Sequence, residues 1–489
     1  MEYNKIQQML KRYSFEEKMR ISQVYSKRLM SPTGLIEIDK MRELPLPWEL
    51  ETFLLFSVTS MEWKDNSFAV DTEKDFVKAI NSIKNYTHPV LEQAKGTVSF
   101  VDKFIIAMGA VQFDIQEYYP YKFYRYNFYF SFSNEKINMP KLFQEKFGCS
   151  YADFIVFAQF LWLIFADRVH LIPQQLFEFL QFRFSSVIAQ LSLTRAQYIA
   201  ELNSITDNIS DYLYCLRPSY TYPFIIEQHK LYLPLPHLLI RSVTSSLMYR
   251  LTEGKNELTN LIGKEVLEPY LYQIIKESSL FDEVFSEQEY YDKKRKQRTL
   301  DVMARKDNCY IFFDSKMHAP KRNLRILDQS VFETEVRLLA DNCKQIYLHI
   351  RKRFPLLYNP FSDSRPIDPE NIYGLVVVRD DPHIRIEHIY QKAAELLEID
   401  QDSVEFNWLC RHVGITAIYE IEKYCFTSSD IISTIFANSR TGRINDFWLT
   451  SQLNRNTISN IEVRKFKQNL ADSCISFAEE CKDAGVLDS

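Results

Sequence analysis

The run IYGLVVV, Ile372 to Val378, is the feature that most restricts the fold of this 489-residue chain. A strand with one solvated face alternates apolar and polar residues, whereas a continuous apolar run is typical of a strand that is covered on both faces. We therefore expect a central strand here, in a sheet with helices packed against both sides.

The patterns on either side of this run supply the rest of an α/β domain. Apolar residues recur at helical spacing from residue 256 to 278 and again from about 330 to 353. The expected order is α-β-β-β-α-β-α-β, which predicts a mixed sheet. Its remaining elements are strands in FDEVFSEQEYY (281–291), TLDVMAR (299–305), CYIFFDSK (309–316) and around 414–421, and a helix around 386–398.

Three parts of the chain follow from these patterns. Residues 251–425 form the α/β domain, 1–250 a mainly helical region for recognition, regulation or oligomerisation, and 426–489 a helical extension. The aromatic stretch YYPYKFYRYNFYFSF (118–132) is compatible with a base-stacking platform through Lys122 and Arg125. We favour the simpler interpretation that residues 118–132 form a strand or helix whose rings pack in a core.

Composition excludes several classes of protein. The net charge of −5 carries no global basic signature, so any contact with nucleic acid must come from local patches. Neither G-x-G-x-x-G nor G-x-x-x-x-G-K occurs, which argues against Rossmann and P-loop cofactor sites. The eight cysteines include no C-x-x-C and suit buried thiols in a reducing cytosol. The charged N-terminus and the short apolar run 154–166 predict neither a signal peptide nor a membrane span, and hence a cytoplasmic protein.

The strand CYIFFDSK ends in a carboxylate and an ammonium two residues apart. If Asp307 and Asn308 form a two-residue turn, Lys306 faces Cys309 and Asp301 lies opposite Asp314. Since side chains alternate along a strand, Asp301, Asp314 and Lys316 share one face at one end of the hairpin. Two carboxylates this close repel unless a cation lies between them, and Mg²⁺ prefers such oxygen ligands. Lys316 beside the metal would hold or help deprotonate a bound water, as phosphodiester hydrolysis requires.

This arrangement resembles the PD-(D/E)xK nuclease superfamily. Asp301, in TLDVMA, stands for the first acid, and Asp314-Ser315-Lys316 for the second motif. The family's α-β-β-β-α-β core matches the order expected for residues 260–420. Thr299-Leu300 replaces the proline that gives the motif its name, a departure that the family tolerates.

The resemblance also implies further site residues. Family members usually carry a glutamate on the helix before the sheet, and in GKEVLE we match it to Glu268, with Glu265 as a close alternative on the same helical face. A polar residue on the helix after the motif is matched to Gln345. The implied catalytic residues are Asp301, Asp314, Lys316, Glu268 and Gln345. The implied ligands of Mg²⁺ or Mn²⁺ are Asp301, Asp314, Glu268 and the carbonyl of Ser315.

A basic run, DKKRKQR, precedes the Asp301 strand. It carries five cations in seven residues: Lys293, Lys294, Arg295, Lys296 and Arg298. Such a loop beside a metal site would bind phosphates without reading sequence. Taken alone, it is equally well explained as a solvated loop.

The sequence thus predicts a metal-dependent endonuclease that cuts nucleic acid, with DNA favoured over RNA. Analogy with the family suggests a prokaryotic defence or restriction role, acting as a homodimer or with a partner protein of the defence system. Two alternatives stay open: a nucleic-acid-binding protein with a nuclease-like fold that does not cut, and a scaffold without affinity for metal or nucleic acid. A nuclease that is active only after a partner or ligand binds is a variant of the first hypothesis.

Overall fold

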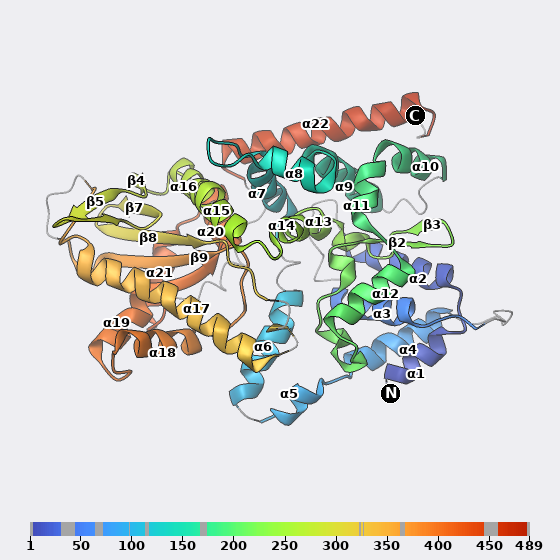
Figure 1. The fold of residues 1–489 in the computed structure, drawn as a ribbon, viewed down its shortest axis with the longest axis horizontal. Helices are drawn as coiled ribbons and strands as arrows, with labels where there is room; N and C mark the ends of the chain where they lie inside the picture. Colours follow the sequence, from blue (N-terminus) through green and yellow to red (C-terminus); the bar gives the residue numbers. More distant parts are fainter. Residues whose placement is uncertain are drawn as a thin grey trace.

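The computed structural model describes residues 3–30, 45–63, 72–96, 98–112, 117–166, 174–321, 324–325, 327–361, 367–444 and 458–486. Figure 1 shows an elongated molecule with the main sheet at one end and both chain termini at the other, helical end. Helix α22 (Ile461–Asp483) runs along one long edge above the helices of the middle region.

The main sheet has five strands in the order β10-β9-β8-β7-β4. The strands β8, β9 and β10 are parallel, whereas β7 is antiparallel to both β8 and β4, which confirms the mixed sheet. The strands are β4 (Glu283–Ser286), β7 (Val302–Lys306), β8 (Cys309–Lys316), β9 (Ile372–Val378) and β10 (Val413–Ala417).

Helices cover both faces of this sheet, as the apolar run of β9 predicted. Every residue of β9 is buried, and alternate residues belong to two separate cores. One face packs against α17 (Gln329–Leu348), α18 (Ile386–Leu397) and α19 (Val404–His412). The other packs against α16 (Glu268–Glu277) and α20 (Ile418–Thr427). Because Tyr310 and Phe312 of β8 face α17, Asp314 and Lys316 lie on that side too.

The second core does not stop at residue 250. It includes α7 (Tyr119–Ser131), α8 (Met139–Phe147), α9 (Tyr151–Ala166) and α14 (Ser245–Thr252), all packed in the same cluster as the β8 residues Ile311 and Phe313. The middle helices and the sheet therefore share one hydrophobic interior, and the sheet end is not a separate globule.

The aromatic stretch forms helix α7 and is almost entirely buried. Lys122 and Arg125 are paired with Glu117, and Arg125 also with Glu422 at 3.0 Å. The rings are thus core residues, as we favoured, and they are not exposed for base stacking.

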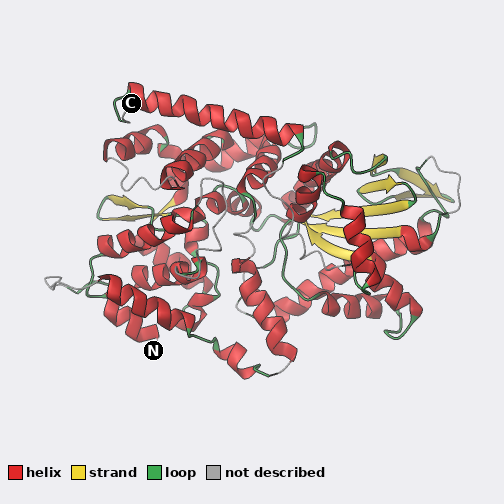
Figure 2. Ribbon diagram, turned by 180° about the vertical axis from the view of Figure 1, so that it is seen from behind, coloured by secondary structure: helices red, strands yellow, loops and turns green. Residues whose placement is uncertain are grey.

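Most of the remaining helices pack around a separate core at the other end of the molecule. The helices at 174–183, 185–191 and 239–242 contribute instead to the core shared with the sheet. A small sheet, β1-β2-β3, lies among them, and Figure 2 shows how far it is from the main sheet. The helices of this part and of the linking region are α1 (Tyr3–Leu10), α2 (Phe15–Leu29), α3 (Pro47–Thr59), α4 (Thr72–Lys84), α5 (Pro89–Gln93), α6 (Val98–Gln112), α10 (Gln174–Arg183), α11 (Ser185–Leu191), α12 (Arg195–Ile205) and α13 (Leu239–Ser242). The strands are β1 (Ser192–Thr194), β2 (Phe224–Glu227) and β3 (Lys230–Tyr232).

The amphipathic helix before the sheet is interrupted in the middle. Its first part is α15 (Asn256–Ile262), a π-helical turn spans Gly263–Leu267, and α16 follows from Glu268. Pro269 lacks the N–H that a regular α-helix would use to bond the carbonyl of Glu265, so a wider turn is accommodated just before it. Gly263 brings this turn close to the end of β8, since an added Cβ would lie 3.3 Å from the Met317 Cβ.

Three expected elements differ in detail. The segment FDEVFSEQEYY contains two strands, β4 and β5 (Glu289–Asp292), because the chain turns away from the main sheet after Ser286. Strand β10 ends at Ala417, where α20 begins, and not at residue 421. The helix predicted for 330–353 ends as α at Leu348 and continues as a π-helical turn to Arg353.

Two further expectations can be compared with the structure. All eight cysteines are free and buried. Within the described ranges no single helix is long and apolar enough to cross a membrane, although α8 and α9, bent by 70° at their junction, pass that test as a pair by length and composition.

The last described helix before α22 is α21 (Ile431–Arg440).

Candidate active site

The hairpin of β7 and β8 has the predicted register. Lys306 pairs with Cys309, and the ladder continues to Val302 opposite Phe313. Asp307 in the turn has a φ of 52°, as a tight two-residue turn requires. Asp301 is the residue before Val302 and Asp314 the one after Phe313, so the two carboxylates meet at the open end of the hairpin.

Direct contacts join this end of the hairpin. The backbone N–H and the hydroxyl of Ser315 both donate to Asp301 Oδ2, at 2.6 and 2.8 Å. The Lys316 Nζ lies 2.7 Å from Asp314 Oδ2. Asp314 is only 5 % exposed, while the side chain of Lys316 is 30 % exposed. Within this pair, Lys316 is therefore the more exposed residue.

Glu268, on the helix before the sheet, lies near enough to this cluster for the charges to act on its pKa. Burial raises its pKa to about 8, and the charges of Asp301 and Glu287 add to that rise. Burial likewise raises the pKa of Asp301 to about 7, followed in effect by the charge of Asp314. For both carboxyl groups, burial and, after it, nearby negative charge favour the protonated form.

The pKa of Lys316 is shifted in the opposite sense. Burial by itself lowers it, but the charges of Asp314 and Asp301 outweigh burial and hold the pKa above its ordinary value. The ammonium is consequently charged across the physiological range. In this arrangement it can orient a water or stabilise a phosphate oxygen, but it does not accept a proton.

The structure separates the two glutamates between which the sequence left a choice. Glu265 bonds to Asn134 at 3.0 Å and to Lys136 at 2.8 Å, whereas the charges acting on Glu268 are those of the hairpin cluster. Residues three apart share a face in an α-helix, but the π-helical turn at 263–267 has more residues per turn and rotates them apart. Glu268 alone belongs to the site.

Gln345 does not join these residues, which corrects the assignment made by resemblance. Its side chain is exposed, because the face of α17 that packs on the sheet carries Leu339, Cys343 and Ile346. The polar residue of α17 near the end of β8 is Glu335, which is 1 % exposed. Its Oε2 lies 2.8 Å from His318 Nε2, two residues beyond Lys316.

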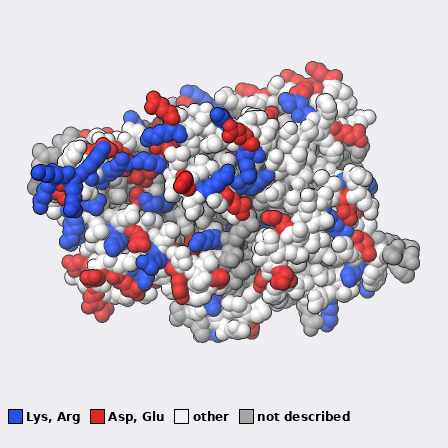
Figure 3. All heavy atoms as spheres, viewed as in Figure 1, with Lys and Arg blue, Asp and Glu red and all other residues white. Residues whose placement is uncertain are grey.

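The basic run forms a hairpin and not an irregular loop. Strand β5 pairs with β6 (Arg295–Arg298), with Lys293 and Lys294 at the turn. All five cations of the run are exposed, and Figure 3 shows Lys and Arg gathered at this end of the molecule. Lys296 and Arg298 pair with Glu289 and Arg298 also with Glu287. No ion pair of the described residues involves Lys293, Lys294 or Arg295, which leaves the tip with uncompensated positive charge.

The hairpin is inserted at the edge of the sheet where the carboxylates lie. Ser286 at the end of β4 pairs with Val302 at the start of β7, and the hairpin is the chain between them. Its stem is fixed by Thr299, whose N–H donates to the Gln288 carbonyl at 2.9 Å. Glu287 at the stem acts on the pKa of Glu268. The basic surface and the acidic cluster are thus adjoining parts of one structure.

The donor set suits a hard divalent cation in its chemistry. Asp301, Asp314 and Glu268 offer oxygen ligands only, and a cation would offset the burial and the repulsion that raise the pKa of Glu268 and of Asp301. The side chains are not drawn together into a finished site, however: among the described residues, no group of three or more His, Cys, Asp or Glu is placed to hold a metal ion. Lys316 lies against the Asp314 oxygen that a cation would share.

Sequence reasoning missed three residues that belong to this neighbourhood. Lys264 lowers the pKa of Glu268, Glu287 raises it, and Glu335 fixes His318. Lys264 precedes Glu268 by four residues, the spacing of an i, i+4 pair, which is a signal available in GKEVLE. For Glu287 and Glu335 the sequence carries no such signal, because their proximity depends on how distant segments pack.

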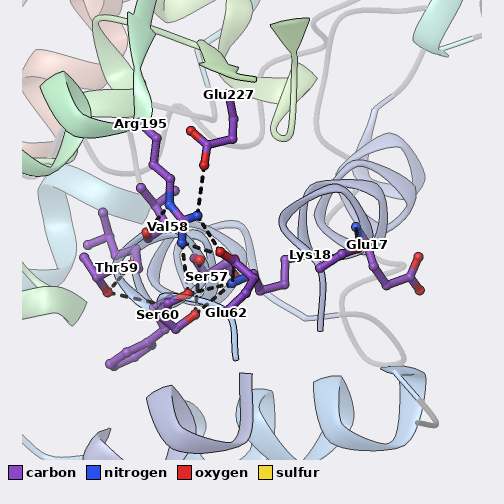
Figure 4. Close-up of polar contacts among 12 residues, drawn as sticks. Glu17, Lys18, Ser57, Val58, Thr59, Ser60, Glu62, Arg195 and Glu227 are labelled. Atoms are coloured by element: carbon purple, nitrogen blue, oxygen red, sulfur yellow. Dashed lines mark hydrogen bonds and ion pairs between the residues drawn. The ribbon is translucent and has the colours of Figure 1, made fainter. Parts of the chain in front are cut away.

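A separate buried ionic cluster lies in the N-terminal helices (Figure 4). Lys18 donates to the Ser60 carbonyl at 2.7 Å and pairs with Glu62, and burial lowers its pKa to about 8. Arg195 joins the same Glu62 at 2.8 Å and Glu227 at 3.3 Å. Because these groups satisfy one another between α2, α3, α12 and β2, the cluster serves to hold helices together.

Comparison of the chain with protein-family models, with curated proteins and with solved structures finds no match.

Proposed function

We propose that the protein is a metal-dependent nuclease with a restriction-endonuclease-like fold, which hydrolyses phosphodiester bonds of nucleic acid, with DNA as the favoured substrate. The observation that carries the proposal is the meeting of Asp301, Asp314 and Lys316 at one end of the hairpin, with Glu268 close enough for their charges to act on it. These residues come from two strands and a helix, and they sit beside an exposed basic hairpin. A fold held together by its cores has no need of such a cluster, because concentrated like charge destabilises it.

Each residue has a definable task in this chemistry. Asp301, Asp314 and Glu268 would hold Mg²⁺ or Mn²⁺, with the Ser315 carbonyl as a further oxygen. A bound cation would supply an activated water and stabilise charge on the phosphate. Lys316 remains an ammonium and would orient the water or pair with a phosphate oxygen. Ser315 keeps Asp301 in place through its two hydrogen bonds.

The basic hairpin would hold the nucleic-acid backbone to one side of the scissile bond. Its strands have four residues each, so its tip lies about 13 Å beyond its stem, at about 3.3 Å per residue. Along one strand of a duplex this is about four nucleotides, at about 3.4 Å each. Contacts of this kind bind phosphates and do not read bases.

A nucleic-acid-binding protein that does not cut is the second candidate. Two observations favour it. Lys316 forms an ion pair with the Asp314 oxygen that a cation would bind, and no three described carboxylates are placed to bind one metal ion together. This candidate predicts binding that is insensitive to chelator and no cleavage under any condition.

The deciding experiment uses plasmid DNA, single-stranded DNA and RNA, with Mg²⁺, with Mn²⁺ and with chelator. We expect metal-dependent cleavage by the wild type that is abolished in Asp314→Asn and in Lys316→Met. Lys306→Met is the matched control, since it removes a lysine from the opposite end of the same hairpin. Binding without cleavage would favour the second candidate, and cleavage that survives both site substitutions would exclude this active site.

A further inference from the structure

A cavity lies just beyond the ends of the catalytic strands, outside the carboxylate cluster. It is lined by the segments that follow β8 and β9 and by helices of the middle region. Its volume is about 130 Å³. A water needs about 10–15 Å³ on this measure and fills about 30 Å³ of liquid, so there is room for on the order of ten waters, or a molecule of about 300 Å³.

Positive charge from four different segments lines this cavity. The four arginines are Arg125 of α7, Arg241 of α13, Arg325 after β8 and Arg379 after β9, facing three carboxylates, Glu117, Asp380 and Asp381. Arg125 and Arg379 are 3 % and 4 % exposed and paired with acids. The lining arginines outnumber the lining carboxylates by one, and guanidinium groups suit phosphate oxygens because they donate paired N–H bonds.

Tyr220 contacts several of the arginines in and around the cavity and is itself held by hydrogen bonds. Its ring lies 3.7 Å from the guanidinium carbon of Arg241, 5.8 Å from that of Arg325 and 5.6 Å from that of Arg217. Its hydroxyl donates to Glu51 at 2.5 Å, and its carbonyl accepts from Ser246 at 2.7 Å. The Tyr220 ring therefore positions two of the guanidinium groups that line the cavity.

The other lining groups suit the rest of a nucleotide. Hydroxyls of Thr221 and Ser245 and the rings of Tyr249 and Tyr419 line the same cavity. Such a combination of arginines, hydroxyls and aromatic rings binds a phosphate, a sugar and a base, respectively.

The walls of the cavity are continuous with the candidate active site. Ala319 and Pro320 follow Lys316 by three and four residues. The N–H of Arg379 donates to the Lys316 carbonyl at 3.1 Å, and that of Asp380 to the His318 carbonyl at 3.2 Å. A ligand that contacts Arg379 therefore acts on a residue whose backbone is bonded to that of Lys316.

We propose that this cavity binds a small phosphate-bearing molecule, a nucleoside monophosphate in size and chemistry, and that its occupancy orders the backbone at Lys316. The binding site stands on its own geometry, whereas the effect on cleavage rests on the proposed nuclease function. Because the ligand orders the backbone that carries Lys316, its binding is expected to activate the enzyme.

Calorimetric titration of the full chain tests the binding. The probes are inorganic phosphate, AMP, GMP and an unphosphorylated DNA tetranucleotide. We expect one mononucleotide per chain, with affinity at least tenfold lower in Arg241→Gln and in Arg325→Gln. Arg183→Gln is the matched control, because Arg183 also lies over an aromatic ring but far from the cavity. Ser245→Phe, which fills the cavity and keeps every arginine, must abolish binding as well.

Three outcomes would overturn the proposal. These are no mononucleotide binding at millimolar concentration, equal affinity in the arginine variants, or a tetranucleotide that binds more tightly than AMP and GMP and displaces them. The last would make the cavity part of the substrate path. In the cleavage assay, saturating nucleotide must raise the wild-type rate at least threefold, and an unchanged rate would remove the coupling. Nucleotide binding without cleavage under any condition would remove the nuclease function and leave the binding site.

Discussion

Ser315 is bonded to Asp301 twice, through its backbone N–H and its hydroxyl, at 2.6 and 2.8 Å from one carboxylate oxygen. The bonds cross from β8 to the residue before β7, at the point where the ladder of the hairpin ends. They hold Asp301 beside Asp314 in spite of the repulsion between the carboxyl groups. The pKa of Asp301, raised to about 7 chiefly by burial, shows that the repulsion and desolvation are not fully compensated.

Asp301→Asn is expected to stabilise the protein at pH 8 when divalent cations are absent. Between the ordinary pKa of an aspartate, 3.8, and the folded value of about 7, the folded state binds more protons than the unfolded state. The free energy of unfolding contributed by this group is therefore fully present below pH 4 and is lost as the pH rises to 7. Asparagine does not ionise and can still accept the bonds from Ser315, so the variant should gain about 1–3 kcal/mol over wild type from pH 5 to pH 8.

Urea unfolding at both pH values in chelator measures this difference. Asp207→Asn, at an exposed aspartate elsewhere, is the control. If Asp301→Asn and wild type lose stability equally from pH 5 to 8, Asp301 is not the strained group. Added Mg²⁺ should stabilise wild type more at pH 8 than at pH 5, and the variant little at either, because cation binding needs the ionised carboxylates.

Glu268→Gln and Glu265→Gln form a matched pair on one helical turn. The first removes a carboxyl group that would ionise on binding the metal, and it should lower metal-dependent cleavage by about 100-fold or more. The second breaks an ion pair with Lys136, whose side chain is 64 % exposed, and should change cleavage less than threefold. Steady-state cleavage rates of the two variants, compared with wild type, measure this difference. Equal reductions would mean that the π-helical turn does not separate them.

Gly263→Val should weaken activity without touching any site residue. The turn at Gly263 approaches Met317 so closely that an added Cβ would lie 3.3 Å from its Cβ, and valine adds two further methyl groups. Overpacking of this kind costs about 1–3 kcal/mol and shifts the helix that carries Glu268. We expect a lower melting temperature and a cleavage rate reduced at least tenfold. The double variant Gly263→Val/Met317→Ala should regain the melting temperature and the cleavage rate, because the close contact is between these two residues. Failure to regain them would contradict the prediction.

Alanine at Lys293, Lys294 and Arg295 should weaken binding of nucleic acid at every sequence alike. These are exposed cations at the tip of the hairpin for which the described residues form no ion pair. For each phosphate that no longer pairs with a cation, the slope of log affinity against log salt concentration falls by about 0.9 on duplex DNA. Fluorescence anisotropy over a range of salt concentrations measures the slope, with exposed Lys141→Ala on α8 as the control. An unchanged slope would show that the hairpin lies outside the binding surface.

Local patterns were sufficient for the sheet and for half of the site. The continuous apolar run of β9 required helices on both faces, and the two-residue turn at Asp307 and Asn308 fixed the register that brings Asp301 to Asp314. Both follow from the alternation of side chains along a strand, a property of the backbone that needs no knowledge of the rest of the fold.

Tertiary structure alone decided the remainder. The contacts of Glu265 with the distant residues Asn134 and Lys136 turned it away from the site and left Glu268, although regular helical spacing treats the two glutamates alike. The packing of α17 turned Gln345 to solvent and Glu335 to His318. The cavity around Tyr220 joins segments up to about 300 residues apart, as from Glu117 to Tyr419. Contacts of such range arise only when separate elements pack, whereas the sequence by itself determined what each short segment does within its own strand, turn or helix.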